Sequence, residues 1–197
     1  MRPHDLLRLT PHANLIAEDA PAWVVPSLAR APFVVVRRAR IDGDLVPVGV
    51  RGTSRAERVP ALLHRRDVAE TLTPESLARS TVPRRPLPAL AALTDVANAA
   101  AQFDLVWGPA GSVGFELASG AVVVTVESDL DIVLRPQARH TRMDLSEFLR
   151  RIDLLGVRVD ATIESELGAV ALREWLLSPD CALIKTASGP QLGAFAW

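Results

Sequence analysis

The sequence predicts an α+β protein with a smaller N-terminal α+β domain and a C-terminal domain in which helices pack on a short mixed sheet. Three observations predict this fold class. Some segments alternate apolar and polar residues as strands do, others repeat apolar residues at helical spacing, and a proline-rich stretch separates two groups of such segments. The 197 residues, of which 49% are hydrophobic, suffice for one large or two small packed domains.

The N-terminal part begins with a predicted β-hairpin. Residues 32–40 are rich in β-branched side chains, Asp42-Gly43-Asp44 has turn chemistry, and residues 45–50 resume an apolar run. We expect a helix over residues 55–68, although Pro60 removes a backbone donor within it, and a further helical turn over residues 74–79.

A linker is predicted where three prolines occur within six residues, Pro83-Arg84-Arg85-Pro86-Leu87-Pro88. Proline lacks a backbone donor and keeps the chain extended, so this stretch is a natural break between folded units. We therefore place a domain boundary here, with residues 1–86 forming an accessory domain and residues 87–197 forming the second domain.

The C-terminal part alternates predicted helices and strands. We expect helices over residues 89–103, 145–155 and 169–177. We expect strands over residues 105–107, 121–127, 129–134, 157–164 and 182–186, with an extended segment over 192–197. Between them, the three glycines of residues 108–114 break regular structure.

Two of these elements have strong local signals. For the helix over 145–155, Asp144 is a candidate N-terminal cap with Glu147 three residues on, and Gly156 lies just past the end. The segment 157–164 alternates apolar and polar residues at the period of a half-exposed strand, and its polar face carries the carboxylates of Asp160 and Glu164.

The candidate catalytic residues are the aspartates of Ser128-Asp129-Leu130-Asp131. Alternate residues of a strand point the same way, so Asp129 and Asp131 share one face. Neighbouring carboxylates repel each other, and Mg²⁺ relieves this repulsion through oxygen coordination while it binds phosphate oxygens. Asp160 is our first choice for a third ligand and Glu164 the alternative. An acidic pair at the start of a strand is also explained by a solvated sheet edge.

The candidate substrate-binding residues lie elsewhere in the chain. Gly111 and Ser112 can present backbone N–H groups and a hydroxyl to a phosphate, because glycine allows close approach. Arg51 suits either a phosphate contact or a solvated basic face, whereas a solvated face is our preferred interpretation of Arg55 and Arg58. Lys185 is the only lysine and could bind a phosphate as a point charge, or be an exposed edge residue.

Composition narrows the functional class. With 22 basic and 23 acidic residues, the net balance does not call for nucleic acid or an anionic membrane. No signal peptide or membrane-spanning apolar run is visible, so we expect a cytoplasmic protein. The single cysteine, Cys181, excludes an internal disulfide, and we expect it to be a small core residue.

Several segments together resemble a known family, the malonate decarboxylase holo-acyl carrier protein synthases, or phosphoribosyl-dephospho-CoA transferases. The segments that carry the resemblance are residues 107–120 (WGPAGSVGFELASG), 128–135 (SDLDIVLR), 4–7 (HDLL), 47–52 (PVGVRG) and 183–190 (LIKTASGP). They are spread from residue 4 to residue 190, so the resemblance extends over nearly the whole chain. The resemblance implies a polymerase β-like nucleotidyltransferase fold for the C-terminal domain.

The resemblance also implies a reaction. A phosphoribosyl-dephospho-CoA group would pass from its triphosphate precursor to a serine of the apo acyl carrier subunit of malonate decarboxylase, with release of pyrophosphate. Asp129 and Asp131 would then hold Mg²⁺, Gly111 and Ser112 would contact the triphosphate, and residues 1–86 would bind carrier or substrate. Two alternatives stay open: the same transfer to the citrate lyase carrier, and a catalytically silent module that binds the carrier or a nucleotide.

Overall fold

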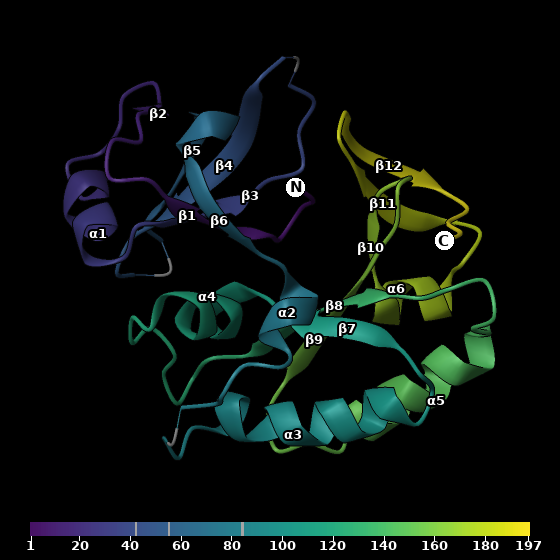
Figure 1. Cartoon of the computed structure of the whole chain (residues 1–197). Helices are drawn as coiled ribbons and strands as arrows, with labels where there is room; N and C mark the ends of the chain where they lie inside the picture. The colour runs from purple at the N-terminus through teal and green to yellow at the C-terminus, as the bar shows by residue number, and fades with distance from the viewer. Residues whose placement is uncertain (42, 55, 84) are drawn as a thin grey trace.

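Two sheets form the framework of the protein (Figure 1). This computed structural model describes residues 1–41, 43–54, 56–83 and 85–197, and within these ranges each sheet has six strands. The strand order is β2-β5-β4-β3-β1-β6 in the N-terminal sheet and β12-β11-β10-β9-β8-β7 in the C-terminal sheet. With helices beside both sheets, the predicted α+β fold class is confirmed.

The N-terminal sheet contains the first six strands. They are β1 (Leu6–Leu9), β2 (Leu15–Ile16), β3 (Phe33–Val36), β4 (Leu45–Arg51), β5 (Arg58–His64) and β6 (Val68–Leu72). Helix α1 (Val24–Arg30) precedes β3, a 3-10 turn (Arg65–Asp67) precedes β6, and α2 (Pro74–Leu77) follows β6. The predicted hairpin is confirmed as the antiparallel pair β3–β4, although its turn residue Asp42 lies outside the described residues.

The helix predicted over residues 55–68 is wrong. Arg55, its first residue, lies outside the described ranges, and residues 58–64 form β5, which pairs with β4 along its full length. Burial alternates along the second half of β5, so its period is that of a strand, and the pairing gives the apolar side chains Ala61 and Leu63 a place in the N-terminal core.

The C-terminal sheet contains the other six strands. They are β7 (Val106–Pro109), β8 (Leu130–Arg135), β9 (Val159–Glu164), β10 (Ala169–Ala171), β11 (Ala182–Thr186) and β12 (Gly189–Gly193). The helices of this part are α3 (Pro88–Ala101), α4 (Gly111–Ser119), α5 (Arg142–Ile152) and α6 (Leu172–Leu177). The boundary that we place after residue 86 falls between α2 and α3, in a segment whose Arg84 lies outside the described residues.

Three predictions in this part need correction. Residues 111–119 form helix α4, although we expected residues 108–114 to break regular structure. Residues 121–127 are not a strand, and residues 169–171 are a short strand ahead of α6. In the segment 121–127, the backbone N–H groups of Val123 and Val124 both donate to Glu116 Oε2 at 2.9 Å. A buried carboxylate on α4 therefore takes the place of a neighbouring strand.

Helix α5 begins earlier than we predicted. Thr141 is its cap: the Thr141 side chain accepts from the backbone N–H of Asp144, and the Asp144 carboxylate accepts from that of Thr141. The helix ends at Ile152, ahead of Gly156. Cys181, which we expected in the core, is exposed.

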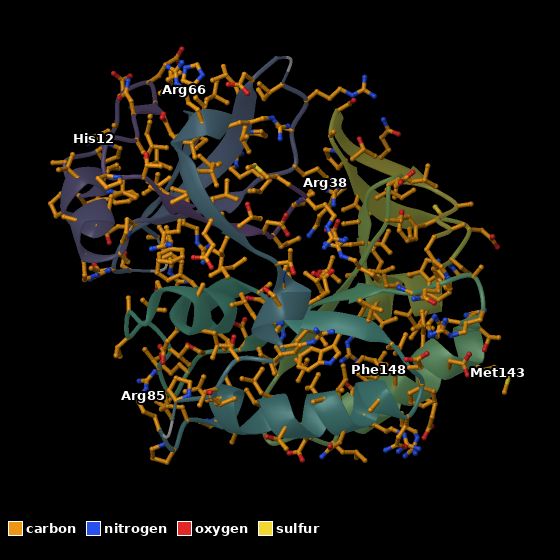
Figure 2. The ribbon with its side chains drawn as sticks, viewed as in Figure 1. His12, Arg38, Arg66, Arg85, Met143 and Phe148 are labelled. Atoms are coloured by element: carbon orange, nitrogen blue, oxygen red, sulfur yellow. The ribbon has the colours of Figure 1, made fainter. Side chains whose placement is uncertain are left out.

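The C-terminal sheet has two different faces. Alternation along β8 buries Leu130, Ile132 and Leu134 in a core shared with α3 and α5, where Phe148 of α5 lies beneath the sheet (Figure 2). The other face is turned toward the N-terminal sheet. A separate apolar cluster that includes Leu6, Leu77 and Phe115 joins the N-terminal sheet to α2 and α4.

Candidate active site

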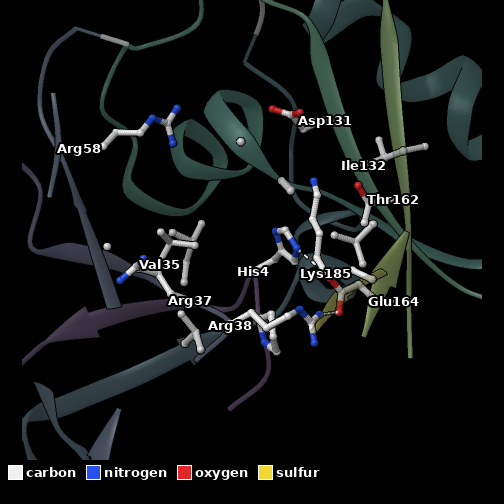
Figure 3. A pocket seen from close by; sticks show the side chains of 18 of the residues that line it. His4, Val35, Arg37, Arg38, Arg58, Asp131, Ile132, Thr162, Glu164 and Lys185 are labelled. Atoms are coloured by element: carbon white, nitrogen blue, oxygen red, sulfur yellow. Dashed lines mark hydrogen bonds and ion pairs between the residues drawn. The ribbon is translucent and has the colours of Figure 1, made fainter. Parts of the chain in front are cut away.

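A pocket of about 700 Å³ lies between the two sheets (Figure 3). Both halves of the chain line it. The charged and polar lining residues of the N-terminal sheet and its loops are His4, Arg37, Arg38, Arg51 and Arg58. Those of the C-terminal part are Asp131, Thr162, Glu164, Lys185 and Thr186. The site is therefore built by tertiary packing of segments far apart in the sequence.

Strand alternation explains why Asp131 faces this pocket. Its neighbours Leu130 and Ile132 are buried in the helix-covered core, so Asp131 points to the opposite face of the sheet. The parallel register of β8 and β9 places Asp160 directly beside Asp131 on that face. Asp129 immediately precedes β8.

Gly111, the first residue of α4, contacts Asp131. The φ of Gly111 is +55°, and a Cβ built on it would lie 1.9 Å from Asp131 Oδ2. Only glycine fits both constraints. The backbone N–H of Ala110 donates to the carbonyl of Asp131 at 2.8 Å, so the N-terminus of α4 is tied to β8. A helix N-terminus, which favours anions, and a strand carboxylate, which favours cations, thus meet at the pocket wall.

The structure brings four of the seven sequence-predicted site residues to the pocket. Gly111, Asp131, Arg51 and Lys185 line it, and Ser112 is buried in the first turn of α4. Asp129 and Asp160 are not among the lining residues. The Asp160 carboxylate accepts a hydrogen bond from Arg158 Nε at 2.9 Å, and no group of three or more His, Cys, Asp or Glu side chains within the described ranges is arranged to hold a metal ion. The metal-binding roles of Asp129, Asp131 and Asp160 stay predictions.

Glu164, our alternative third ligand, is occupied by another contact. Its buried carboxylate lies 3.0 Å from His4 Nε2 and forms an ion pair with Arg38, and both partners come from the N-terminal half. Burial by itself would raise the pKa of the Glu164 carboxyl, but the hydrogen bonds from His4 and Arg38 outweigh it and hold that pKa below its usual range. Glu164 therefore joins the two sheets as a carboxylate.

Arg51 also contacts the other half of the molecule. Its guanidinium carbon lies 5.7 Å from the ring centroid of Phe115 on α4, which is cation–π geometry. Arg51 and Arg58 are cross-strand partners on β4 and β5, so both guanidinium groups lie on the pocket face of the N-terminal sheet. From the sequence, a phosphate contact and a solvated face were equally favoured for Arg51, and a solvated face was preferred for Arg58.

Sequence reasoning missed Arg37 and Arg38 altogether. They directly follow β3, whose apolar side chains enter the N-terminal core, and the end of that strand lies at the pocket. The sequence signal that could have identified them is a pair of adjacent arginines at the end of a buried strand. The sequence alone does not show which surface the strand end faces.

Comparison with known proteins extends over both halves of the chain. Residues 76–194 match the family described as Phosphoribosyl-dephospho-CoA transferase MdcG C-terminal domain, and residues 2–74 match the corresponding N-terminal domain. No solved structure gives a significant match.

Curated relatives with the name phosphoribosyl-dephospho-CoA transferase are similar over more than nine tenths of their length. The relative from Pseudomonas putida is 41% identical over 196 residues, which cover 100% of this chain and 95% of the relative. The relative from Pseudomonas aeruginosa is 38% identical with 99% and 93% coverage, and that from Klebsiella pneumoniae is 36% identical with 100% and 96% coverage.

Proposed function

The chain belongs to the phosphoribosyl-dephospho-CoA transferase family and is a transferase enzyme, and we propose that it loads the acyl carrier subunit of malonate decarboxylase. In this reaction the 2′-(5″-phosphoribosyl)-3′-dephospho-CoA group passes from its triphosphate precursor to a serine of the apo carrier. The serine oxygen forms a phosphodiester with the α-phosphorus, the serine proton is lost, and pyrophosphate leaves.

One observation supports nucleotidyl transfer at this site: the contact between Gly111 and the Asp131 carboxylate at the wall of the pocket. The choice of carrier is proposed from the family resemblance. Transfer of a nucleotidyl group needs donors for phosphate oxygens and carboxylates for a metal ion within reach of the same phosphate. The N-terminus of α4 and the start of β8 supply the two kinds of group at one place. The buried Ser112 hydroxyl is our further candidate for a phosphate contact.

Asp129 and Asp131 would hold Mg²⁺, with Asp160 as the proposed third ligand. The chemistry of these residues suits this ion, because Mg²⁺ prefers carboxylate oxygens and takes its remaining ligands from water and phosphate. Within the described residues the three carboxylates are not gathered into a metal-holding group. When bound, Mg²⁺ neutralises charge on the phosphates of the donor. Arg158 now engages Asp160, so this carboxylate would have to turn from Arg158 toward Asp131, its neighbour on β8.

The activity test uses both candidate carriers. The protein is incubated with Mg²⁺, the triphosphate precursor and either the apo malonate decarboxylase carrier or the apo citrate lyase carrier, and each carrier is weighed by mass spectrometry. We expect a gain equal to the prosthetic group on the malonate decarboxylase carrier. A gain only on the citrate lyase carrier would reassign the substrate, and a gain on neither would favour a silent binding module.

Variants test the residues. Asp131→Asn and Asp129→Asn should each lower the rate of transfer at least about 100-fold while the protein stays folded, because each removes a charge proposed to hold the metal ion. Asp95→Asn is the matched control, since Asp95 is exposed on α3, which covers the opposite face of the sheet. Turnover by Asp131→Asn equal to that of the control would show that the metal site lies elsewhere.

A further inference from the structure

The pocket between the sheets carries excess positive charge. Its lining includes five cationic side chains, Arg37, Arg38, Arg51, Arg58 and Lys185, and two carboxylates, Asp131 and Glu164. With His4 neutral, the walls have a net charge of three positive. A cavity of this charge favours a polyanion, because its low-dielectric walls strengthen the attraction.

The protein itself already engages two of these cations across the domain interface. Arg38 forms its ion pair with Glu164, and Arg51 lies over the Phe115 ring. Arg37 and Lys185 differ from them. Across the part of the chain that the structure describes, neither side chain makes a hydrogen bond, an ion pair or a cation–π contact. Their charges are therefore available to a ligand.

Arg37 and Lys185 lie on opposite walls of the same pocket (Figure 3). Arg37 follows β3 of the N-terminal sheet, and its backbone N–H donates to the carbonyl of Pro47 at 2.8 Å. Its aliphatic stem passes over Gly49, where an added Cβ would lie 3.4 Å from Arg37 Cδ. Lys185 lies on β11, paired with Ala169 on one side and Pro190 on the other. Both backbones are thus held by sheet hydrogen bonds.

We propose that Arg37 and Lys185 together form a phosphate-chain subsite that spans the two domains. Guanidinium and ammonium groups on facing walls suit the successive phosphates of a chain, the first through paired donors and the second as a point charge. This inference rests on the proposed function for the identity of the phosphate chain, which is either the triphosphate of the donor or the diphosphate within its dephospho-CoA part.

Lys185, as the only lysine, allows a direct test. The full-length protein without added Mg²⁺ is acetylated with an amine-reactive reagent, and the modification of Lys185 is followed by peptide mass spectrometry. The probes are inorganic tripolyphosphate in one arm and dephospho-CoA in the other, and an added lysine peptide reports reagent activity. At about ten times the Kd of a probe, roughly one site in ten stays free, so acetylation of Lys185 should slow about tenfold.

Arg37→Gln should weaken this protection, with the Kd of the protecting probe raised at least about tenfold because a charge-assisted contact is lost. The matched control is Arg66→Gln, which removes an exposed arginine at the far end of the N-terminal domain and should leave protection unchanged (Figure 2). Protection by either probe that depends on Arg37 supports the subsite and identifies the phosphate chain. Lack of protection by both probes, or equal protection in the two variants, would overturn it.

This result is separable from the activity test. Carrier loading without protection of Lys185 would leave the transferase function standing and remove the subsite. Protection of Lys185 without carrier loading would keep a phosphate-binding pocket and reject the proposed transfer.

Discussion

At the residue scale, two features of position 111 require glycine. Its φ of +55° is unfavourable for residues with a Cβ, and the space that a Cβ would occupy holds the Asp131 carboxylate. The sequence shows a glycine before a serine. The structure shows that this glycine permits a helix N-terminus and a strand aspartate to approach each other.

Gly111→Ala should therefore displace the Asp131 carboxylate. We expect a fall in carrier loading on the order of 100-fold, since a displacement of about 1 Å at a reacting centre can have an effect of this size. Initial rates measured by mass spectrometry of the carrier would check it.

The control for this substitution is Gly120→Ala. Gly120 has a similar φ of +71°, yet nothing lies within 4 Å of an added Cβ. Both variants bear the conformational cost of about 1–2 kcal/mol, but only Gly111→Ala meets a carboxylate. If Gly120→Ala loses as much activity as Gly111→Ala, backbone strain explains the loss and the Asp131 contact does not.

At the element scale, two residues together cap the N-terminus of helix α5. Asp144 was identified from the sequence as a capping residue, and the structure confirms its capping role but assigns the N-terminal cap position to Thr141. The reciprocal hydrogen bonds of Thr141 and Asp144 satisfy donors that the first turn leaves open.

Thr141→Ala should lower the free energy of unfolding by about 1 kcal/mol, because the alanine side chain accepts no hydrogen bond from Asp144. Urea denaturation would measure the change. Thr94→Ala is the comparison, since Thr94 is exposed within α3 and alanine is the better helix former there. A loss in Thr94→Ala equal to that in Thr141→Ala would contradict the capping account.

Other elements depended on contacts that the sequence does not reveal. Residues 121–127 have strand-forming composition, yet the Glu116 carboxylate, which also pairs with Arg85, binds the backbone of Val123 and Val124. Residues 58–64 were expected in a helix, and pairing with β4 makes them a strand. In both cases tertiary partners outweigh local preference.

At the scale of the whole molecule, ion pairs and apolar packing hold the two sheets around the pocket. Glu164 binds His4 and Arg38, and Glu75 of α2 pairs with both Arg2 and Arg135. These ion pairs contribute to the arrangement that places Arg37 and Lys185 on the walls of one pocket. Within the described residues no helix is long and apolar enough to cross a membrane.

Glu164→Gln should lower the free energy of unfolding by about 3 kcal/mol near neutral pH, since it removes the charge that neutralises Arg38 in a largely buried setting. The control is Glu70→Gln, which breaks an exposed ion pair with Arg8 and should cost less than about 1 kcal/mol. Equal losses of unfolding free energy in the two variants would show that the ion pair between the two sheets contributes no more than a surface pair.

The contribution of Glu164 to the free energy of unfolding should depend on pH. Because the pKa of Glu164 is lower in the folded protein, its contribution is present above the usual value of 4.5 and is lost as the pH falls through the folded pKa. The stability difference between wild type and Glu164→Gln, measured by urea denaturation at several pH values, should therefore shrink below pH 4.5. A stability difference that stays constant down to pH 3 would contradict a lowered pKa of Glu164 in the folded protein.

The sequence by itself determined the features that depend on neighbouring residues. These include the α+β class, the hairpin of β3 and β4, helix α3, and the alternation that separates Asp131 from the core residue Leu130. Only the tertiary structure decided that Gly111 contacts Asp131, that Glu164 binds His4 and Arg38, and that Arg37 and Lys185 line one pocket. The physical reason is that local periodicity sets which side of an element a residue faces, whereas long-range packing chooses what lies on that side.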